Sequence, residues 1–281
     1  MIYKRINIAF FVAATVFLIS CTGNKKVDES TALVSDSLLS VGNDSTKNLS
    51  QKSMDEIITS IPSPVEITSL IKQSGSDYNN LLLNPSSNAS LYNTNGKKAL
   101  AIGLYGADLG YINIYEKTYS ALDYLNVVRD LADEIKVGQF FDFNTLKRLA
   151  QSKKNTDSLL LISTNCFNNM DSYLREQKRS NMSVLMACGA WLEGTYLITQ
   201  VAGERVDENL NQRIGEQKAI LYDLLIVLDA CKEDPACISV KNDFEKIKKE
   251  FTGVAISYEF KEPETKEVNG ELVVVDNSKT N

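Results

Sequence analysis

ALAIGLYGADLGYINIY, residues 99–115, places three glycines and one aspartate in an otherwise apolar run. At about 100° per residue on a helix, its small residues fall on one stripe about 100° wide. These residues are Ala99, Gly103, Gly106, Ala107 and Gly110. Such a stripe lets two helix backbones approach closely, and a cost of about 1 kcal/mol for each helical glycine is otherwise hard to explain. We therefore expect a helix over about 97–117 that packs tightly against a second helix.

The glycine spacing does not fit a phosphate-binding loop. Gly103, Gly106 and Gly110 match neither G-x-G-x-x-G nor G-x-x-x-x-G-K-[ST], and the pattern before them does not predict a strand. The sequence therefore favours a helix contact over a nucleotide site.

A second apolar helix, expected over about 181–203, offers the partner face. A shift of 84 residues brings the small stripe onto Ser183, Ala187, Ala190 and Gly194. The acids do not match in this alignment, because Asp108 meets Leu192. The shift predicts a tight central helix pair, and it is too short to establish an internal duplication.

The hydrophobic pattern is helical from Met54 nearly to the end of the chain. Further helices are expected from Ser63 to about residue 74, over about 119–137, from Asp142 or Asn144 to about 152, after Asn155, over about 208–231, and from Asp234-Pro235 onward. The last of these has Val240, Phe244, Ile247 and Phe251 facing inward. The pattern leaves open whether 97–117 and 119–137 form one kinked helix or a hairpin.

Only the C-terminal segment changes its period. VAISYEF, residues 254–260, and ELVVVD, residues 271–276, suggest short strands, and Asn269-Gly270 is typical of a hairpin turn. The predicted fold is an all-α multi-helix bundle over residues 53–253, followed by a short extended or β-hairpin tail over residues 254–281.

The N-terminus has the features of a secretory signal peptide over residues 1–20. Lys4 and Arg5 precede a short apolar run, and that run is too short to span a bilayer comfortably. Residues 18–21, LISC, resemble the lipobox of bacterial lipoproteins, in which Cys21 becomes the acylated first residue of the mature chain. We therefore expect Cys21 to anchor the protein in a lipid bilayer, with residues 21–52 as a flexible tether.

The residues after Cys21 indicate which membrane holds the anchor. Thr22 stands where many lipoproteins of the inner membrane carry aspartate, and Lys25 and Lys26 come before the first acidic residues. We expect an outer-membrane anchor, with the protein facing the periplasm rather than the cell surface.

Composition excludes several classes of function. Cleavage removes Lys4 and Arg5 and no acid, which takes the formal net charge from −6 to −8 and argues against nucleic acid as a partner. The chain has no histidine, which excludes Ser-His-Asp triads, Cys-His pairs and His-ligated zinc or haem. A Ser-Lys pair or a carboxylate-only site remains, so an enzyme is the less favoured class. We expect no metal and no cofactor.

Asp108 and Glu193 are acids within apolar helices, where an unpaired carboxylate costs several kcal/mol or becomes neutral. One interpretation is a satisfied polar network that fixes the register of the helices. The other is a ligand pocket. Its polar and aromatic lining would be Asp108, Tyr111, Tyr115, Trp191, Glu193 and Tyr196.

The cysteines fit an oxidising compartment. Cys231 and Cys237 bracket KEDPA between two helical patterns, so we expect a local disulfide there. Cys166 and Cys188 lie in apolar helical stretches, which favour buried free thiols over a bridge.

The strings YGADLGY (105–111) and GAWLEGTYL (189–197), separated by NTDSLLLI and YLREQKR, resemble a group of uncharacterised all-helical lipoproteins of Bacteroidota-type bacteria. Ala190 stands where a second glycine is expected in that group. The resemblance covers about residues 96–205 and implies an envelope lipoprotein with a helical fold and no assigned activity.

Three functions are open from the sequence. The leading hypothesis is a membrane-anchored, non-enzymatic helical module that binds an envelope protein or a small ligand. The alternatives are a hydrolase of envelope sugars or peptides that uses Asp108 and Glu193, and a purely structural assembly subunit.

Overall fold

The computed structural model describes residues 51–61, 68, 71–150, 156–204, 207–268, 271–275 and 279–280. The predictions for the signal peptide, Cys21 and most of the tether lie outside these residues, as do the N-caps expected at Ser63 and Asn155. The described segments belong to one compact unit that begins at Thr46.

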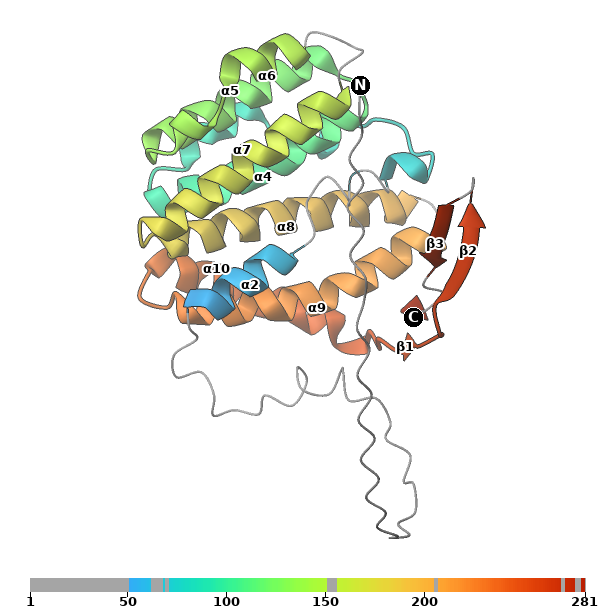
Figure 1. Ribbon diagram of the computed structural model, residues 1–281. Coiled ribbons are helices and arrows are strands. Elements are labelled where there is room, and N and C mark those ends of the chain that lie inside the picture. Colours follow the sequence, from blue (N-terminus) through green and yellow to red (C-terminus); the bar gives the residue numbers. More distant parts are fainter. Residues whose placement is uncertain are drawn as a thin grey trace, which may run out of the picture. The chain divides into compact units, whose positions relative to one another are not determined.

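The fold is an all-α multi-helix bundle with a short extended tail, as the sequence predicts (Figure 1). Its α-helices are α2 (Gln51–Ser60), α4 (Asn95–Ile114), α5 (Thr118–Glu134), α6 (Phe143–Ala150), α7 (Thr156–Glu176), α8 (Ser180–Glu204), α9 (Glu208–Ala230) and α10 (Pro235–Glu250). Short 3₁₀ turns join them: η1 (Asn80–Leu82), η2 (Ser86–Leu91), η3 (Gly138–Phe140) and η4 (Phe251–Gly253). None of the helices in the described part of the chain is long and apolar enough to cross a membrane.

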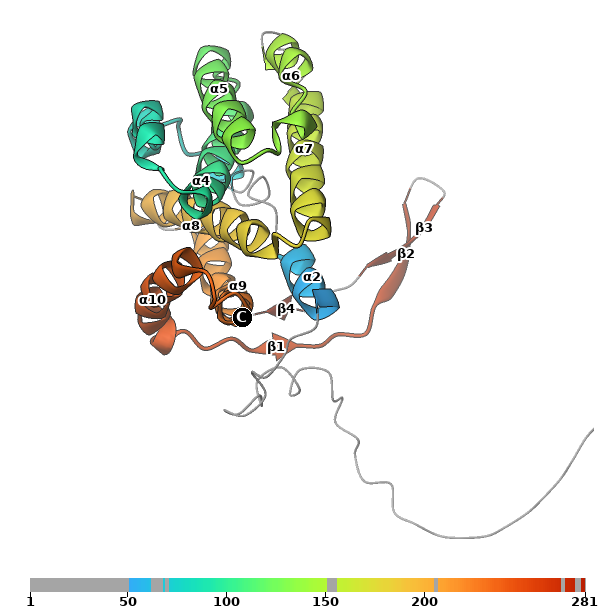
Figure 2. The ribbon, with the colours of Figure 1, turned by 90° about the vertical axis from the view of Figure 1, so that its left-hand side faces the viewer.

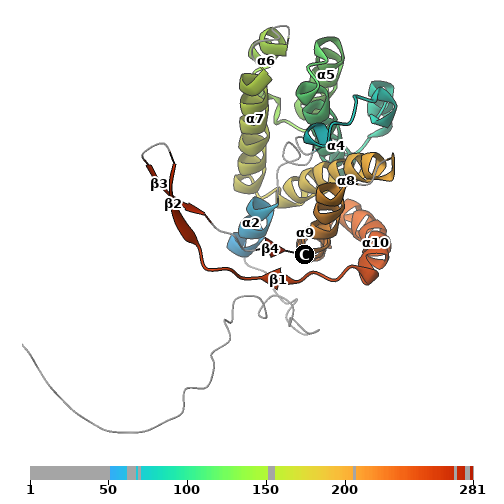
Figure 3. The ribbon, with the colours of Figure 1, turned by 90° about the vertical axis from the view of Figure 1, so that its right-hand side faces the viewer.

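Helix α8 lies in the middle of the bundle. Helices α4, α5, α6 and α7 lie on one side of it, and α2, α9 and α10 lie on the other (Figure 2). The opposite view in Figure 3 shows the same division. α8 is apolar on most of its surface because it is covered from both sides.

The expected tight pair is formed by α4 and α8, which share the most extensive helix contact in the described structure. A Cβ added to Gly103 would lie 2.0 Å from Met186 O, and one added to Gly189 would lie 2.0 Å from Leu100 O. The two glycines mark the crossing point, where the helix backbones touch directly. The 84-residue shift missed Gly189, because it sets Gly189 opposite Tyr105, whereas the helices bring Gly189 against Leu100 and Leu104.

Gly106 faces a different neighbour from the one predicted. A Cβ there would lie 2.5 Å from Phe167 Cζ of α7. The small stripe of α4 is therefore shared between α8 and α7, with Gly103 serving one contact and Gly106 the other.

Helices α4 and α5 form a helical hairpin and not one kinked helix (Figure 1). Glu116 has φ 57° between them, and Lys117 N–H donates to Ile112 O at 3.1 Å. This is the Schellman arrangement, in which a left-handed residue reverses the chain and satisfies the last carbonyls of the helix. α5 ends in the same way at Lys136, with φ 64°, close to the end expected at about residue 137.

The predicted caps of the later helices are present. Asp142 accepts from Thr145 N–H at 3.1 Å before α6, and Asp234 accepts from Ala236 N–H at 2.8 Å before α10, whose first residue is Pro235. On α10, Phe244 is buried and Val240 and Ile247 are half-buried, and Phe251 follows in η4, also buried.

The tail contains two short antiparallel pairs. β2 (Glu264–Val268) pairs with β3 (Glu271–Val275), and Val268 opposes Glu271 across the predicted Asn269-Gly270 turn, which itself lies outside the described residues. β1 (Tyr258–Glu259) pairs with β4 (Lys279–Thr280).

Candidate functional site

Asp108 and Glu193 bring two carboxyl groups together where α4 meets α8. Asp108 is fully buried and Glu193 is 5% exposed. The side-chain amide of Asn84, from the loop between η1 and η2, donates to Asp108 Oδ2 at 3.2 Å and to Glu193 Oε2 at 2.8 Å. Within the described segments no N–H or hydroxyl reaches Asp108 Oδ1 or Glu193 Oε1. The two carboxyl groups are close enough to hydrogen-bond to each other when one carries a proton.

Asn84 is the residue that sequence reasoning missed at this site. Its backbone N–H also donates to Asp108 Oδ2 at 3.2 Å, and its carbonyl accepts from the Tyr124 hydroxyl of α5 at 2.6 Å. The next carbonyl, of Pro85, accepts from Tyr105 of α4 at 2.9 Å. One loop is thereby bonded to α4, α5 and α8. Nothing local in the sequence around Asn84 signals this, because its partners come from distant segments.

Burial is the main reason that the pKa of both carboxyl groups lies above its ordinary range. Repulsion from Glu193 raises the pKa of Asp108 further, whereas the hydrogen bonds from Asn84 act in the opposite direction. The bond between the two acids raises the pKa of Asp108 and lowers that of Glu193. The pair therefore favours one proton held between the two carboxyl groups.

The buried acid pair and Asn84 are better suited to stabilising the fold than to catalysis. Hydrolysis by paired carboxylates requires that both reach the substrate and that water enters between or beside them. Here the acids are sealed in the core and bonded to Asn84. The geometry matches a polar network that fixes the register of α4 against α8.

Tyr111 and Tyr115 lie further along α4, in a cluster with Tyr78. The ring centroids of Tyr78 and Tyr111 are 5.5 Å apart, and those of Tyr111 and Tyr115 are 5.0 Å apart. The Tyr111 hydroxyl accepts from Asn79 N–H at 3.0 Å, and the Tyr115 hydroxyl donates to Ser76 O at 2.7 Å. The cluster fastens the segment before η1 onto the end of α4.

Trp191 and Tyr196 line a separate cavity of about 360 Å³ between α8, α9 and α10. Its other lining residues are Leu192, Thr195, Thr199, Ile214, Ile247, Glu250, Phe251 and Val254. Trp191 Nε1 donates to the buried Gln217 Oε1 at 2.9 Å, and the indole lies 5.1 Å from the ring of Phe244. Trp191 is therefore held in place in the wall of this cavity. The six residues predicted for one pocket occupy three different places in the structure.

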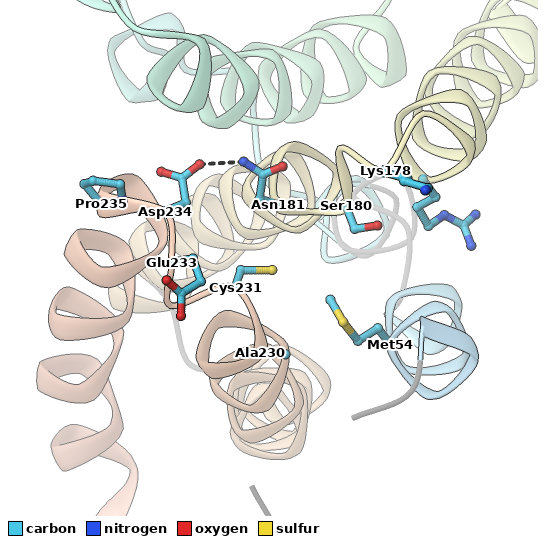
Figure 4. Close-up of a pocket in the computed structure, with 10 residues that line it drawn as sticks. Met54, Lys178, Ser180, Asn181, Ala230, Cys231, Glu233, Asp234 and Pro235 are labelled. Carbon is cyan, nitrogen blue, oxygen red and sulfur yellow. Dashed lines mark hydrogen bonds between the residues drawn. The ribbon is translucent and has the colours of Figure 1, made fainter. Parts of the chain in front are cut away.

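A wider groove of about 900 Å³ opens at the junction of α2, α7, α8, α9 and α10. Figure 4 shows Cys231 in the middle of its lining, with Met54 facing it from α2 and Asn181 and Asp234 bonded to each other at one side. Asn181 Nδ2 donates to Asp234 Oδ2 at 2.5 Å. The groove mixes charges of both signs, with Lys178 and Glu233 among its lining.

The four cysteines that the structure describes are free thiols: Cys166, Cys188, Cys231 and Cys237. Cys231 and Cys237 are hydrogen-bonded to each other, so the two sulfurs that we expect to form a disulfide are neighbours in the reduced state. The disulfide itself stays a prediction.

No protein-family model matches the chain, and no curated protein or solved structure matches it either. The resemblance to all-helical lipoproteins therefore stays a prediction. Among the described residues, no three Asp, Glu, His or Cys side chains group together in a way that would hold a metal ion.

Proposed function

We propose that the protein is a lipid-anchored envelope protein whose helical domain is a non-enzymatic binding module for a small, uncharged, apolar ligand. The observation that carries the proposal is the cavity between α8, α9 and α10. Its volume of about 360 Å³ lies within the range of pockets that bind small molecules in proteins.

The lining determines the class of ligand. Glu250 is the single charged residue among the lining side chains, and the others are apolar, aromatic or hydroxyl-bearing. Apart from Glu250, the lining offers no charge that would compensate a charged ligand for its lost hydration, whereas an apolar ligand gains about 25 cal/mol for each Å² removed from water. Trp191 is held in place before binding, which lowers the entropic cost of association.

Two further points support this class over a hydrolase and over a soluble protein. The burial of Asp108 and Glu193 keeps both acids from substrate. The lipobox-like LISC at residues 18–21 supports an anchor at Cys21, and Thr22 supports the outer membrane, with the domain facing the periplasm.

The ligand site is tested with the intrinsic fluorescence of Trp191, which is the one tryptophan of the chain. The mature chain, made as Cys21→Ser to avoid detergent, is titrated with a bromine-labelled dodecanol, because bromine quenches an indole that it touches. Saturable quenching is expected. Thr199→Phe, which fills the cavity, should weaken it about tenfold, whereas Ile238→Phe at an exposed site of α10 should leave it unchanged.

Quenching that does not saturate, or that Thr199→Phe leaves unchanged in a folded variant, contradicts the ligand site.

The anchor is tested separately by fractionation of cells that make the full chain. The wild type should sediment with the outer membrane, and Cys21→Ala should leave it. A wild type found in the soluble fraction contradicts the anchor and leaves the fluorescence result standing.

A further inference from the structure

Two hydrogen-bonded thiols join the end of α9 to the beginning of α10. Cys231 is the C-cap residue of α9, and Cys237 lies in the first turn of α10. The five residues between them include Asp234, which caps α10 and bonds to Asn181 of α8. The positions of both sulfurs are therefore held by helix ends and not by a free loop.

The two thiols differ in access. Cys231 lines the open groove, where Figure 4 shows it among the lining residues with Met54 on the facing side. Cys237 is fully buried, and its Sγ lies 3.9 Å from Asn181 O. Cys231 is itself only 9% exposed, but it lines the groove, so a reagent there reaches Cys231 rather than Cys237, which has no exposed surface.

We propose that Cys231 and Cys237 form a dithiol site that exchanges with a disulfide bound in the groove, with Cys231 as the attacking and Cys237 as the resolving sulfur. The Cys231 thiolate attacks one sulfur of the incoming disulfide, forms a mixed disulfide and releases the first thiolate, which takes a proton from water. Cys237 then loses its proton to the second departing sulfur and attacks Cys231. The two cysteines lose two electrons and two protons, and the incoming disulfide becomes two thiols.

The surroundings of Cys231 suit the attacking role. The hydrogen bond from the Cys237 thiol lowers the pKa of Cys231, although burial and the Asp234 carboxylate oppose this. The same bond, and after it burial, raises the pKa of Cys237. Cys188, buried nearby on α8, has a pKa raised by burial, so it stays a neutral thiol. A lower pKa on the accessible sulfur is what a thiol–disulfide exchange site requires.

The short connection also suits reversible chemistry. A disulfide stabilises a fold mainly by restricting the unfolded chain, and it does so least when the loop that it closes is short. A bridge across the five residues 232–236 therefore adds stability at the low end of the usual range for disulfides. Each chain reduces one disulfide. The exchange takes place in the groove and not in the cavity lined by Trp191, so it goes beyond the proposed ligand site and does not depend on it.

The test uses the reduced full-length mature chain in detergent micelles, with oxidised glutathione as the probe. Mass spectrometry should find an internal disulfide and no adduct in the wild type. Cys237→Ser should hold glutathione on Cys231, and Cys231→Ser should form no adduct at Cys237. The matched control Cys166→Ser should behave as the wild type, because Cys166 is buried on another helix. A second arm, with an unfolded disulfide-bonded protein as the probe, distinguishes a small disulfide from a protein substrate.

A measurement without variants guards against misfolding of the serine forms. The wild type is equilibrated in mixtures of reduced and oxidised glutathione, and alkylation of the thiols is followed with time. The disulfide should open and close over the range of the buffer, and Cys231 should be alkylated about tenfold faster than Cys237. A disulfide that resists reduced glutathione is purely structural and overturns the proposal. So does a folded Cys237→Ser that forms no mixed disulfide with either probe.

Discussion

At the residue scale, the most informative group is the acid pair with Asn84. Each carboxyl group alone would be costly in the core. Together with one shared proton and the amide of Asn84, they form a network that joins α4 and α8 to the loop. The same network makes stability depend on pH, because both acids bind a proton more tightly in the folded state than in the unfolded state.

The sign of this dependence follows from linkage. A carboxyl group whose pKa is raised by folding contributes most below its unfolded pKa, near 4, and that contribution is lost as the pH rises toward the folded value. Asp108→Asn keeps the shape and removes one titrating group. The free energy of unfolding of the variant, minus that of the wild type, should therefore increase between pH 4 and pH 8, by about 1–2 kcal/mol.

The measurement is urea unfolding across that pH range. Asp243→Asn is the matched control, because Asp243 lies on the surface of α10, with its side chain 64% exposed and 2.8 Å from Lys246. Its difference from the wild type should stay flat. If the free energies of unfolding of Asp108→Asn and of the wild type change with pH in parallel, Asp108 and Glu193 do not share a proton.

At the element scale, the helices expected to end at about 117 and 137 end three residues earlier, at Ile114 and Glu134. α7, for which the sequence predicts no end, ends in the same way. Glu116, Lys136 and Lys178 each adopt a left-handed φ at the end of α4, α5 and α7. The helix-to-turn hydrogen bonds of the Schellman type are present at all three, for example from Val137 N–H to Ala132 O at 2.9 Å. Glycine is the usual signal for such an ending, so its absence hid these boundaries from the sequence.

Lys136→Gly should therefore stabilise the protein. A side chain at φ 64° costs about 1–2 kcal/mol, which glycine avoids. The greater conformational freedom of glycine in the unfolded chain offsets part of this stabilisation. We expect the free energy of unfolding to rise by about 0.5–1 kcal/mol. Lys246→Gly, an exposed position inside α10, should lower it by about 1 kcal/mol. If both substitutions change the free energy of unfolding in the same direction, the left-handed cap at Lys136 is not strained.

The crossing of α4 and α8 gives a second prediction at this scale. Gly103→Ala places a methyl group against Met186 O, which belongs to the backbone and is not free to move aside. We expect a loss of about 2–3 kcal/mol in urea unfolding, because the two helices must separate. Gly203→Ala, in α8 with nothing within 4 Å of the added Cβ, should instead stabilise by up to about 1 kcal/mol. A mild effect at Gly103 would mean that the helices are not in backbone contact there.

At the scale of the whole molecule, the core ends at Val254 and the tail lies beyond it. Phe251 is buried, and Val254 lines the cavity between α8, α9 and α10, with its carbonyl accepting from Lys218 at 2.5 Å. The described side chains that follow, 255–257 and 260–265, are exposed. The bundle should therefore fold without the tail.

A chain that stops after Ala255 should unfold within about 0.5 kcal/mol of the full chain. A chain that stops after Glu250 loses Phe251 and Val254, and it should be destabilised by about 3 kcal/mol or more. Thermal unfolding followed by circular dichroism distinguishes the two. If the chain that stops after Glu250 unfolds at the same temperature as the chain that stops after Ala255, η4 is not part of the core.

Much of the fold could be predicted from the sequence, because the decisive signals are local. The 3.6-residue pattern marks α4, α8, α9 and α10, and Asp142, Asp234 and Pro235 mark helix starts through bonds within one turn. Of the β2–β3 hairpin, the sequence indicated β3 and the Asn269-Gly270 turn but not β2, whose sequence ETKEV is mostly charged. Such features depend on residues fewer than about ten positions apart.

The sites depended on tertiary structure, because helix rotation and crossing are set by packing over the whole molecule. Asp108 and Glu193 meet across 85 positions of sequence, whereas Trp191, two residues before Glu193, faces the opposite side of α8 and enters the apolar cavity. Asn84 carries no local signal of its role. Local patterns therefore fix most of the helices and the all-α class, whereas packing between distant segments sets which side chains share a site, and the anchor at Cys21 stays a prediction.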